Sequence, residues 1–427
     1  MLWFTGNPWT DGNAALHHEE DGILVMDRGR VTARGAASAV DTGDTPVHHI
    51  PDGLIVPGFI DAHLHYPQMR VLGAWGRQLL DWLNDHTFPA ELAFADDAVC
   101  KEAAELFVQS CFSCGVTSAS VFPTVHPGSV EALFRAAAAQ DMAVLTGKVL
   151  MDRNAPAGLM DTAQQGHDES LGLIERWHGK GRARYSVTPR FAPTSTPAQL
   201  EAAGALVRQD PTLHVQSHVS ENRDEVAWVR QLFPNAEHYT DVYAQHGLLG
   251  RRTVLAHGIH LQDAEWQAIH DAGAAVAHCP SSNFFLGSGL FDLEGAVTRH
   301  KVGVALGSDI GGGTHLSPLR TMGEAYKVAQ LRGVSVTAAT LLWHHTAGAA
   351  QALDMADEVG NLDVGSWGDV VVLRPGTDPL SRYRLRFARD VHELLFYALS
   401  CGDDRMVAET WVAGRNVYTR KSEEVPA

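Results

Sequence analysis

The stretch GFIDAHLH, residues 58 to 65, is an apolar, strand-like run that ends in two histidines one residue apart. On a β-strand, residues i and i+2 point to the same face, so His63 and His65 are expected to project together from the carboxyl end of the strand. In a chain with 23 histidines, such a pair taken alone is weak evidence for a metal site. Whether His63 and His65 bind a metal depends on which residues lie at the ends of the other strands.

Similar runs recur seven more times, separated by amphipathic segments of helical length. The expected strands cover residues 58–65, 116–122, 143–152, 183–192, 213–221, 253–260, 274–283 and 303–311. Helical patterns between them include residues 97–113, 129–140, 161–179, 197–209 and 222–232. This alternation predicts parallel strands with helical crossovers. Eight units predict an α/β fold, a (β/α)8 TIM-like barrel, whose catalytic residues lie at the carboxyl ends of the strands.

The two ends of the chain differ from this middle part. Residues 1–57 and 359–427 contain short β-like runs and glycine turns, such as MDRGRVTARG, and are expected to pair into a small β-sandwich domain. The barrel would then occupy residues 58–358. Within it, the segment 66–96 is too long for an ordinary loop after a strand, which makes it a candidate lid over the barrel mouth.

Composition limits the classes of partner. A formal net charge of −17 argues against nucleic acids and anionic membranes. The chain has no apolar run of about 18 residues and no signal-peptide pattern at its start, so a cytoplasmic location is expected. Five scattered cysteines are too few for a disulfide framework, and the Cys111–Cys114 pair is interpreted as packing within a helix.

Metal-competent residues also end three of the later strands. The fifth strand ends in SHVSE, with His218 followed three residues later by Glu221. The sixth contains His257, and the eighth ends at Asp309 before a glycine-rich turn. Histidines and a carboxylate with one open position form a zinc arrangement that suits hydrolysis, because zinc lowers the pKa of bound water to about 7. Barrel histidines that only form hydrogen bonds are the competing interpretation, and the recurrence at strand ends disfavours it.

These motifs resemble the amidohydrolase superfamily in its mononuclear aminohydrolase branch. Over residues 50 to 415, the resemblance narrows to the guanine deaminases through seven segments: PGFIDAHLHYPQ, LLDWLNDHTFPAE, GKVLMDRNAP, TPRFAPTS, SHVSEN, CPSSNFFLGSGLF and SDIGGGT. It implies a homodimer with one zinc ion per chain. The implied zinc ligands are His63, His65, His218 and Asp309, with His257 beside the metal or as a further ligand.

The resemblance further implies the hydrolysis of guanine to xanthine and ammonia. Hydroxide would attack the ring carbon that carries the amine. Glu221 would protonate the neighbouring ring nitrogen and then relay a proton to the departing amine. Asp309 would orient the water, and His257 would stabilise the developing charge. For Glu221 the alternative is an acidic residue that favours the start of a helix.

Five residues are candidates for binding the substrate. Arg190, in TPRFAP, suits the adjacent oxygen and nitrogen acceptors of guanine, and Gln68 offers both a donor and an acceptor. Phe191 would present a ring face or a backbone group, and Trp82 and Leu83 would close over the ring. The alternatives are a surface salt bridge for Arg190, a loop cap for Gln68 and lid packing for Trp82.

Two other functions stay open at this point. A related 2-amino-4-oxo heterocycle, such as a pterin or 8-oxoguanine, presents the same edge to Gln68 and Arg190. A metal-free barrel with a scaffolding role is the other, although such a barrel is expected to have lost its ligands. A second metal bridged by a carboxylated lysine is disfavoured, because Arg190 ends the fourth strand and Lys148 lies one strand earlier. Cys279 and the pair His344–His345 are given no role at the site.

Overall fold

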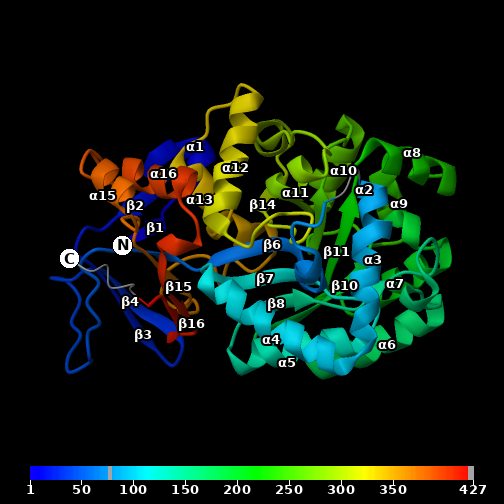
Figure 1. Cartoon of the computed structure of the whole chain (residues 1–427), viewed down its shortest axis with the longest axis horizontal. Coiled ribbons are helices and arrows are strands. Elements are labelled where there is room, and N and C mark those ends of the chain that lie inside the picture. The colour runs from blue at the N-terminus through cyan, green and yellow to red at the C-terminus, as the bar shows by residue number, and fades with distance from the viewer. Residues whose placement is uncertain (76–78, 422–427) are drawn as a thin grey trace.

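The computed structural model describes residues 1–75 and 79–421, and a barrel of eight parallel strands forms its centre (Figure 1). All eight predicted strands are present and pair in chain order, which confirms the barrel. Their bounds are β6 (Phe59–His65), β7 (Val116–Phe122), β8 (Ala143–Thr146), β10 (Ala183–Pro189), β11 (His214–Val219), β12 (Thr253–His257), β13 (Ala275–His278) and β14 (Gly303–Leu306). The short β9 (Val149–Leu150) extends the third strand and pairs with β10.

Between β6 and β14, two histidines complete the ring of strands. The Ile60 N–H donates to the carbonyl of His345 at 2.8 Å, and the Leu306 N–H donates to the carbonyl of His344 at 2.9 Å. The Nδ1 atoms of the two rings lie 2.9 Å from the Ile60 carbonyl and 2.7 Å from the carbonyl of Val304. His344 and His345 therefore have a structural role at this seam, which the sequence did not indicate.

The predicted helices surround the barrel. Their N-termini follow from capping chemistry, because the side chains of Asp96 and Thr196 accept hydrogen bonds from the first turn of the helix that follows each. The helices that follow the strands are α4 (Asp97–Ser113), α5 (Pro127–Ala139), α6 (Ala163–Trp177), α7 (Pro197–Gln209), α8 (Arg223–Leu232), α9 (Tyr239–Gln245), α10 (Asp263–Ala272), α11 (Pro280–Phe285), α12 (Pro318–Leu331), α13 (Ala338–Trp343) and α14 (Ala347–Ala352). Their buried apolar faces pack against the strands and form most of the core.

The candidate lid is mostly helical. Along the chain it contains a 3-10 helix η2 (Tyr66–Val71), α2 (Leu79–Trp82), a π-helical turn η3 (Leu83–Thr87), α3 (Phe88–Leu92) and a short 3-10 helix η4 (Ala93–Ala95). Residues 76–78 of this segment lie outside the described residues. In Figure 1, α2 and α3 form one column in front of the barrel. The described parts of the segment thus bring Gln68, Leu79, Trp82 and Leu83 to the carboxyl ends of the strands.

Both ends of the chain meet in a separate β region at one side of the barrel (Figure 1). A four-stranded antiparallel sheet in the order β17-β16-β15-β5 joins an N-terminal strand to three C-terminal ones. The bounds are β5 (Leu54–Pro57), β15 (Val370–Leu373), β16 (Val407–Val412) and β17 (Arg415–Thr419). The predicted pairing of the chain ends is confirmed, and the boundaries at 57/58 and 358/359 stay predictions.

The remaining N-terminal strands form two small sheets of their own. They are β1 (Leu2–Phe4) with β2 (Leu16–His18), and β3 (Gly22–Asp27) with β4 (Arg30–Ala36), the hairpin that MDRGRVTARG predicts. The helices α1 (Pro8–Asp11), α15 (Pro379–Leu385) and α16 (Val391–Cys401) complete this side. Among the described residues, no helix has the length and apolar character needed to cross a membrane. Cys111 and Cys114 are buried free thiols at the end of α4, as predicted.

Candidate metal and catalytic site

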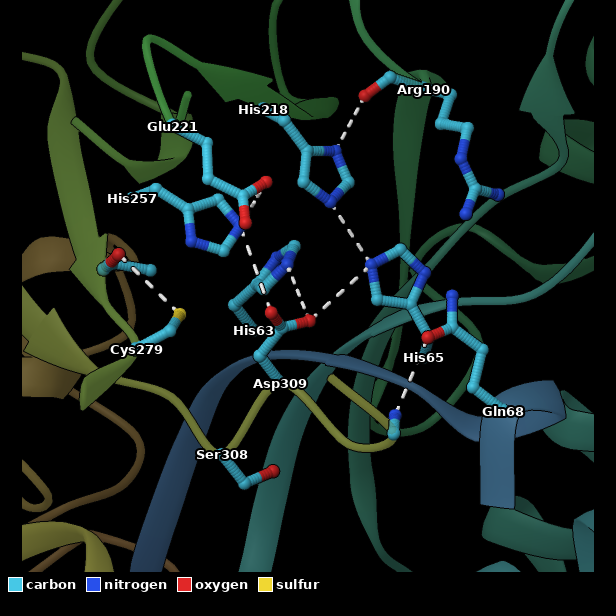
Figure 2. Close-up of polar contacts among 12 residues, drawn as sticks. His63, His65, Gln68, Arg190, His218, Glu221, His257, Cys279, Ser308 and Asp309 are labelled. Atoms are coloured by element: carbon cyan, nitrogen blue, oxygen red, sulfur yellow. Dashed lines mark hydrogen bonds and ion pairs between the residues drawn. The ribbon is translucent and has the colours of Figure 1, made fainter. Parts of the chain in front are cut away.

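Four imidazoles and one carboxylate converge at the carboxyl ends of the strands (Figure 2). His63 and His65 come from β6, His218 from β11, His257 from the end of β12 and Asp309 from the loop after β14. Asp309 Oδ1 lies 3.3 Å from Nε2 of His63 and 3.6 Å from Nε2 of His65. Asp309 Oδ2 lies 3.7 Å from Nε2 of His257. The structure thus brings together all five residues that the sequence placed at the metal.

Backbone conformation aims these side chains inward. His257 and Asp309 have φ values of 74° and 48°, which are unusual for residues other than glycine and turn the chain sharply where each strand ends. Gly307 allows β14 to approach β6, because a Cβ at this position would lie only 2.8 Å from the carbonyl oxygen of His63. The Asp309 N–H then donates to that same carbonyl at 2.9 Å.

The arrangement of nitrogen atoms fits a cation. Nε2 of His65 lies 3.0 Å from Nε2 of His218, and Nε2 of His257 is buried with no hydrogen-bond partner among the described residues. The opposite nitrogens of two rings are already used: Nδ1–H of His218 donates to the carbonyl of Arg190 at 2.6 Å, and Nδ1–H of His257 donates to Oδ1 of Asn283 at 3.0 Å. These bonds select the tautomers whose Nε2 lone pairs face the centre of the cluster.

The protonation states also fit a metal site. Burial and the neighbouring imidazoles hold the pKa values of His65 and His218 well below the usual value, so both rings are neutral donors at pH 7. Burial alone would raise the pKa of Asp309, but His63 and His257 lower it below the usual value. Neutral imidazoles beside an ionised carboxylate are the ligand set that zinc prefers in catalytic sites.

Glu221 lies beside this cluster and points into the same cavity. Its Oε2 is 3.4 Å from Nε2 of His257, and the hydroxyl of Ser288 donates to its Oε1 at 3.2 Å. Burial raises the pKa of Glu221 to about 7. The capping carboxylate of α8 is Glu225, which accepts from the N–H groups of Glu221 and Asn222, so the Glu221 side chain does not cap this helix. A carboxyl group with a raised pKa beside His257 is suited to exchange a proton near neutral pH.

His257 differs from the other histidines. Burial lowers its pKa, but Glu221 and Asp309 together raise it above the ordinary value. It is therefore the imidazole of the cluster best placed to carry a proton. The ligand atoms of His63, His218 and His257 lie within 4.8 Å of one another, so the geometry is compatible with His257 either beside the metal or among its ligands, the two places that the sequence leaves open.

Away from Glu221 and His257, two further predicted residues face the cavity (Figure 2). The Arg190 guanidinium is 2% exposed, so the surface salt bridge considered for it is excluded. Its Nη1 donates to both carboxylate oxygens of Glu91, at 2.9 and 2.8 Å. Gln68 donates from Nε2 to the same carboxylate at 3.3 Å and accepts at Oε1 from the Gly311 N–H at 3.4 Å. Glu91 was missed by the sequence analysis, although its motif TFPAE was noted there.

A cavity open to solvent lies between these polar groups, and its empty space, open solvent included, is about 400 Å³. All the predicted substrate-binding residues line it together with the catalytic candidates and an apolar wall from the lid. The lining residues are His65, Gln68, Leu79, Trp82, Leu83, Arg190, Phe191, His218, Glu221, His257, Leu286, Asp309 and Gly312. The indole N–H of Trp82 donates to the carbonyl of Ala74 at 3.2 Å, and the residue also lines the cavity, so it both packs within the lid and borders the site.

Two other residues near the site make contacts outside the proposed ligand set. Cys279 has its sulfur near His63 and Asp309, but its thiol donates to the carbonyl of Ala277 at 3.6 Å, and burial raises the pKa of the thiol well above the usual value. Lys148 is fully buried and forms ion pairs with Asp161 and, at 3.4 Å, with Glu169. These ion pairs occupy the Lys148 ammonium, so it is not placed to bridge a second metal ion.

A match to a known family agrees with this geometry. The amidohydrolase family model matches residues 54–417, which is more than half of the chain. The chain belongs to the amidohydrolase family. The resemblance to this family that the strand-end motifs predict is therefore confirmed.

Among amidohydrolases, this chain is similar to guanine deaminases. The guanine deaminase of Escherichia coli strain K12 is 44% identical over 416 residues, which cover 95% of this chain and 93% of the relative. A solved structure of E. coli guanine deaminase has a TM-score of 0.95 at 42% identity and covers 98% of both chains. A guanine deaminase from C. acetobutylicum, solved with guanine bound in the active site, has a TM-score of 0.88 at 26% identity and also covers 98% of both chains.

Proposed function

We propose that this chain is a guanine deaminase, which hydrolyses guanine to xanthine and ammonia. The observation that carries the proposal is one cavity with two chemically different ends. One end holds Glu221 beside a cluster of metal ligands, and the other holds Arg190 and Gln68, whose donors and acceptor suit the edge of a purine. The relatives named guanine deaminase, one of them solved with guanine in its active site, support the same substrate.

The metal is proposed to be one zinc ion per chain. His63, His65, His218 and Asp309 would hold it, since pairs of their nitrogen and oxygen donors lie 3.0 to 3.6 Å apart and their protonation states suit zinc. Zinc bound there supplies the Lewis acidity that makes water nucleophilic near neutral pH. A scaffolding role without metal is disfavoured, because every predicted ligand is retained and buried.

Glu221 is proposed to move the protons of the reaction. With a pKa raised to about 7, its carboxyl group can protonate the ring nitrogen beside the reacting carbon and then accept and deliver a second proton to the departing amine. His257, which lies next to the Glu221 carboxylate, would hold a proton. It would stabilise the negative charge that develops on the oxygen of the attacking water. Asn283 would keep the His257 ring in the orientation that this role needs.

The base is proposed to lie between the lid and the strand ends. Arg190 would donate to the carbonyl oxygen and the adjacent ring nitrogen of guanine, while Gln68 would contact a second edge. Phe191, Trp82 and Leu83 would cover the ring with apolar surface and exclude water. These contacts would place the amine-bearing carbon toward Glu221.

A panel of substrates tests the proposal. The purified, zinc-loaded enzyme is incubated with guanine, 8-oxoguanine, pterin and adenine, and ammonia release is measured. We expect guanine to be the best substrate and adenine, which lacks the carbonyl oxygen, to be inert. Little turnover of guanine beside rapid turnover of pterin or 8-oxoguanine would contradict the proposal and favour the alternative substrates.

Assembly and location are part of the same proposal. Guanine deaminases resemble this chain over nearly its whole length, and the resemblance implies a homodimer that acts in the cytoplasm on a small-molecule substrate. Light scattering coupled to size-exclusion chromatography tests the dimer, and fractionation of the native cells tests the location.

A further inference from the structure

Glu91 is a buried carboxylate that contacts both of the residues proposed to read the base. It is fully buried in α3 and accepts two hydrogen bonds from Nη1 of Arg190. The same carboxylate accepts from Nε2 of Gln68 at 3.3 Å. Because a buried charge is stable only when it is paired and hydrogen-bonded, Glu91 and Arg190 fix each other's position. Gln68 is fixed by the same group, so one carboxylate orients both of these side chains.

Phe88, three residues before Glu91 on the same helix, makes a second contact with this arginine. Residues three apart lie on one face of a helix, and the Phe88 ring centroid is 5.7 Å from the guanidinium carbon of Arg190. The α3 helix of the lid therefore presents an aromatic ring and a carboxylate to one guanidinium. Arg190 binds both carboxylate oxygens through Nη1 alone, so Nε and Nη2 are not committed to this ion pair.

The net charge of the Glu91–Arg190 ion pair affects whether the cavity binds neutral or anionic purines. With Glu91 ionised, the guanidinium donates hydrogen bonds while the pair as a whole is electrically neutral. Without Glu91, the same cavity would contain an unpaired buried cation, which attracts anions strongly because the surroundings have a low dielectric constant. The binding affinity for anionic purines would then rise relative to that for neutral purines of similar shape.

We infer that Glu91 is a positioning and specificity-determining residue for the base. It holds Arg190 and Gln68 in the orientation that binds a neutral purine edge, and it cancels the arginine charge so that anionic purines are not favoured. The inference rests on the proposed function, because guanine is the neutral base concerned. It also gives the lid a role beyond covering the cavity, since the lid supplies the residue that sets selectivity.

The test compares wild-type enzyme with Glu91→Gln, which keeps the size of the side chain but removes its charge. Zinc content, kcat and KM for guanine are measured, together with the inhibition constants of hypoxanthine, a neutral purine, and urate, a monoanion at neutral pH. We expect zinc content to stay the same and KM to rise about tenfold, with a smaller change in kcat. The affinity for urate relative to hypoxanthine is expected to rise about tenfold. An unchanged KM or an unchanged ratio of the two inhibitors would overturn the inference.

A second variant separates positioning from folding. Glu91→Asp keeps the charge but shortens the reach toward Arg190, so KM is expected to rise while the urate-to-hypoxanthine ratio stays at the wild-type value. If Glu91→Gln does not fold, Glu91→Asp decides alone, and a wild-type KM would overturn the inference. Glu131→Gln is the matched control, because Glu131 accepts from Nε of Arg176 at 2.6 Å on the outer surface of α5.

The proposed function and this inference fail in different ways. If wild-type enzyme releases no ammonia from guanine, the proposed function fails. Calorimetric binding of hypoxanthine and urate to wild type and Glu91→Gln still measures the role of Glu91 in that case. A shift toward urate in the variant supports the inference, and equal shifts in Glu131→Gln and Glu91→Gln overturn it.

Discussion

Nε2 of His65 lies 3.0 Å from Nε2 of His218, although 153 positions separate the two residues in the chain. Both rings have pKa values well below the usual range, so both are neutral at pH 7 and their facing nitrogens need a shared proton or cation. Nδ1–H of His218 is already donated to the carbonyl of Arg190. This arrangement supports the proposed metal site.

Removal of the metal is expected to abolish turnover and reduce stability. A strong zinc chelator should lower the thermal unfolding midpoint, because an ion at hundredfold excess over its dissociation constant contributes about 2.7 kcal/mol to the folded state. Added zinc should restore both properties. Metal analysis, calorimetry and ammonia release measure these changes. The variant His218→Asn should show the same loss of turnover and stability as the chelated enzyme. The control variant His167→Asn, on the exterior of α6, should show neither loss. Full activity in metal-free enzyme would contradict the site.

Replacement of Glu221 by Gln is expected to leave zinc content unchanged and to reduce kcat by at least about a thousandfold. The amide keeps the size of the side chain but cannot move a proton. Binding of hypoxanthine should change little, which separates lost proton transfer from lost folding. Turnover close to wild type would assign the proton transfer to another group.

Ser288→Ala is expected to shift the pH dependence of kcat/KM. The Ser288 hydroxyl donates to the Glu221 carboxylate and so stabilises its charged form, which lowers the pKa of Glu221. Without this bond the pKa rises above about 7, and the limb of the profile that reports Glu221 should move to higher pH. A profile that keeps its wild-type position would show that the limb belongs to another group.

Asn283→Ala is expected to reduce kcat about ten- to a hundredfold, as for other residues that orient a side chain at a metal site. The substitution removes the acceptor for Nδ1–H of His257 and leaves the ring free to rotate or change tautomer. Because Asn283 contacts none of the proposed ligands, zinc content should not fall. Asn283→Asp restores the acceptor and should recover part of kcat; equal losses in both variants would point to packing instead.

Folding stability is expected to depend on His214 at acidic pH. Its Nε2–H donates to the carbonyl of Leu353 at 2.9 Å, and burial lowers the pKa of the ring from 6.5 to about 4. Above pH 6.5 the ring is neutral whether the chain is folded or unfolded, so no stability is lost there. Between pH 6.5 and about 4 the unfolded chain takes up the proton first, and the free energy of unfolding should fall by up to about 1.4 kcal/mol per pH unit. The free energy of unfolding is measured by urea titration at several pH values. Its dependence on pH should be weaker in His214→Gln than in wild type and unchanged in His167→Gln.

The barrel and the ligand set could be predicted because they depend on local patterns. Each strand is a short apolar run, and its last residues must lie at the barrel mouth wherever the run ends. Glu91 could not be predicted in the same way, since it lies 99 positions from Arg190 and its helix has no periodic pattern of its own. Asn283 and Ser288 escaped detection for the same reason: each becomes functional only through a contact with a distant strand end.

The seam between β6 and β14 has a consequence for the lifetime of the bound ion. The Asp309 N–H donates to the carbonyl of His63, and the His65 N–H donates to the carbonyl of Ile310 at 3.0 Å. Three of the four proposed ligands therefore belong to the two segments whose pairing completes the ring of strands. Any fluctuation that separates the first strand from the last would therefore also separate the proposed ligands of the metal. Slow release of zinc would consequently measure how rarely the barrel opens.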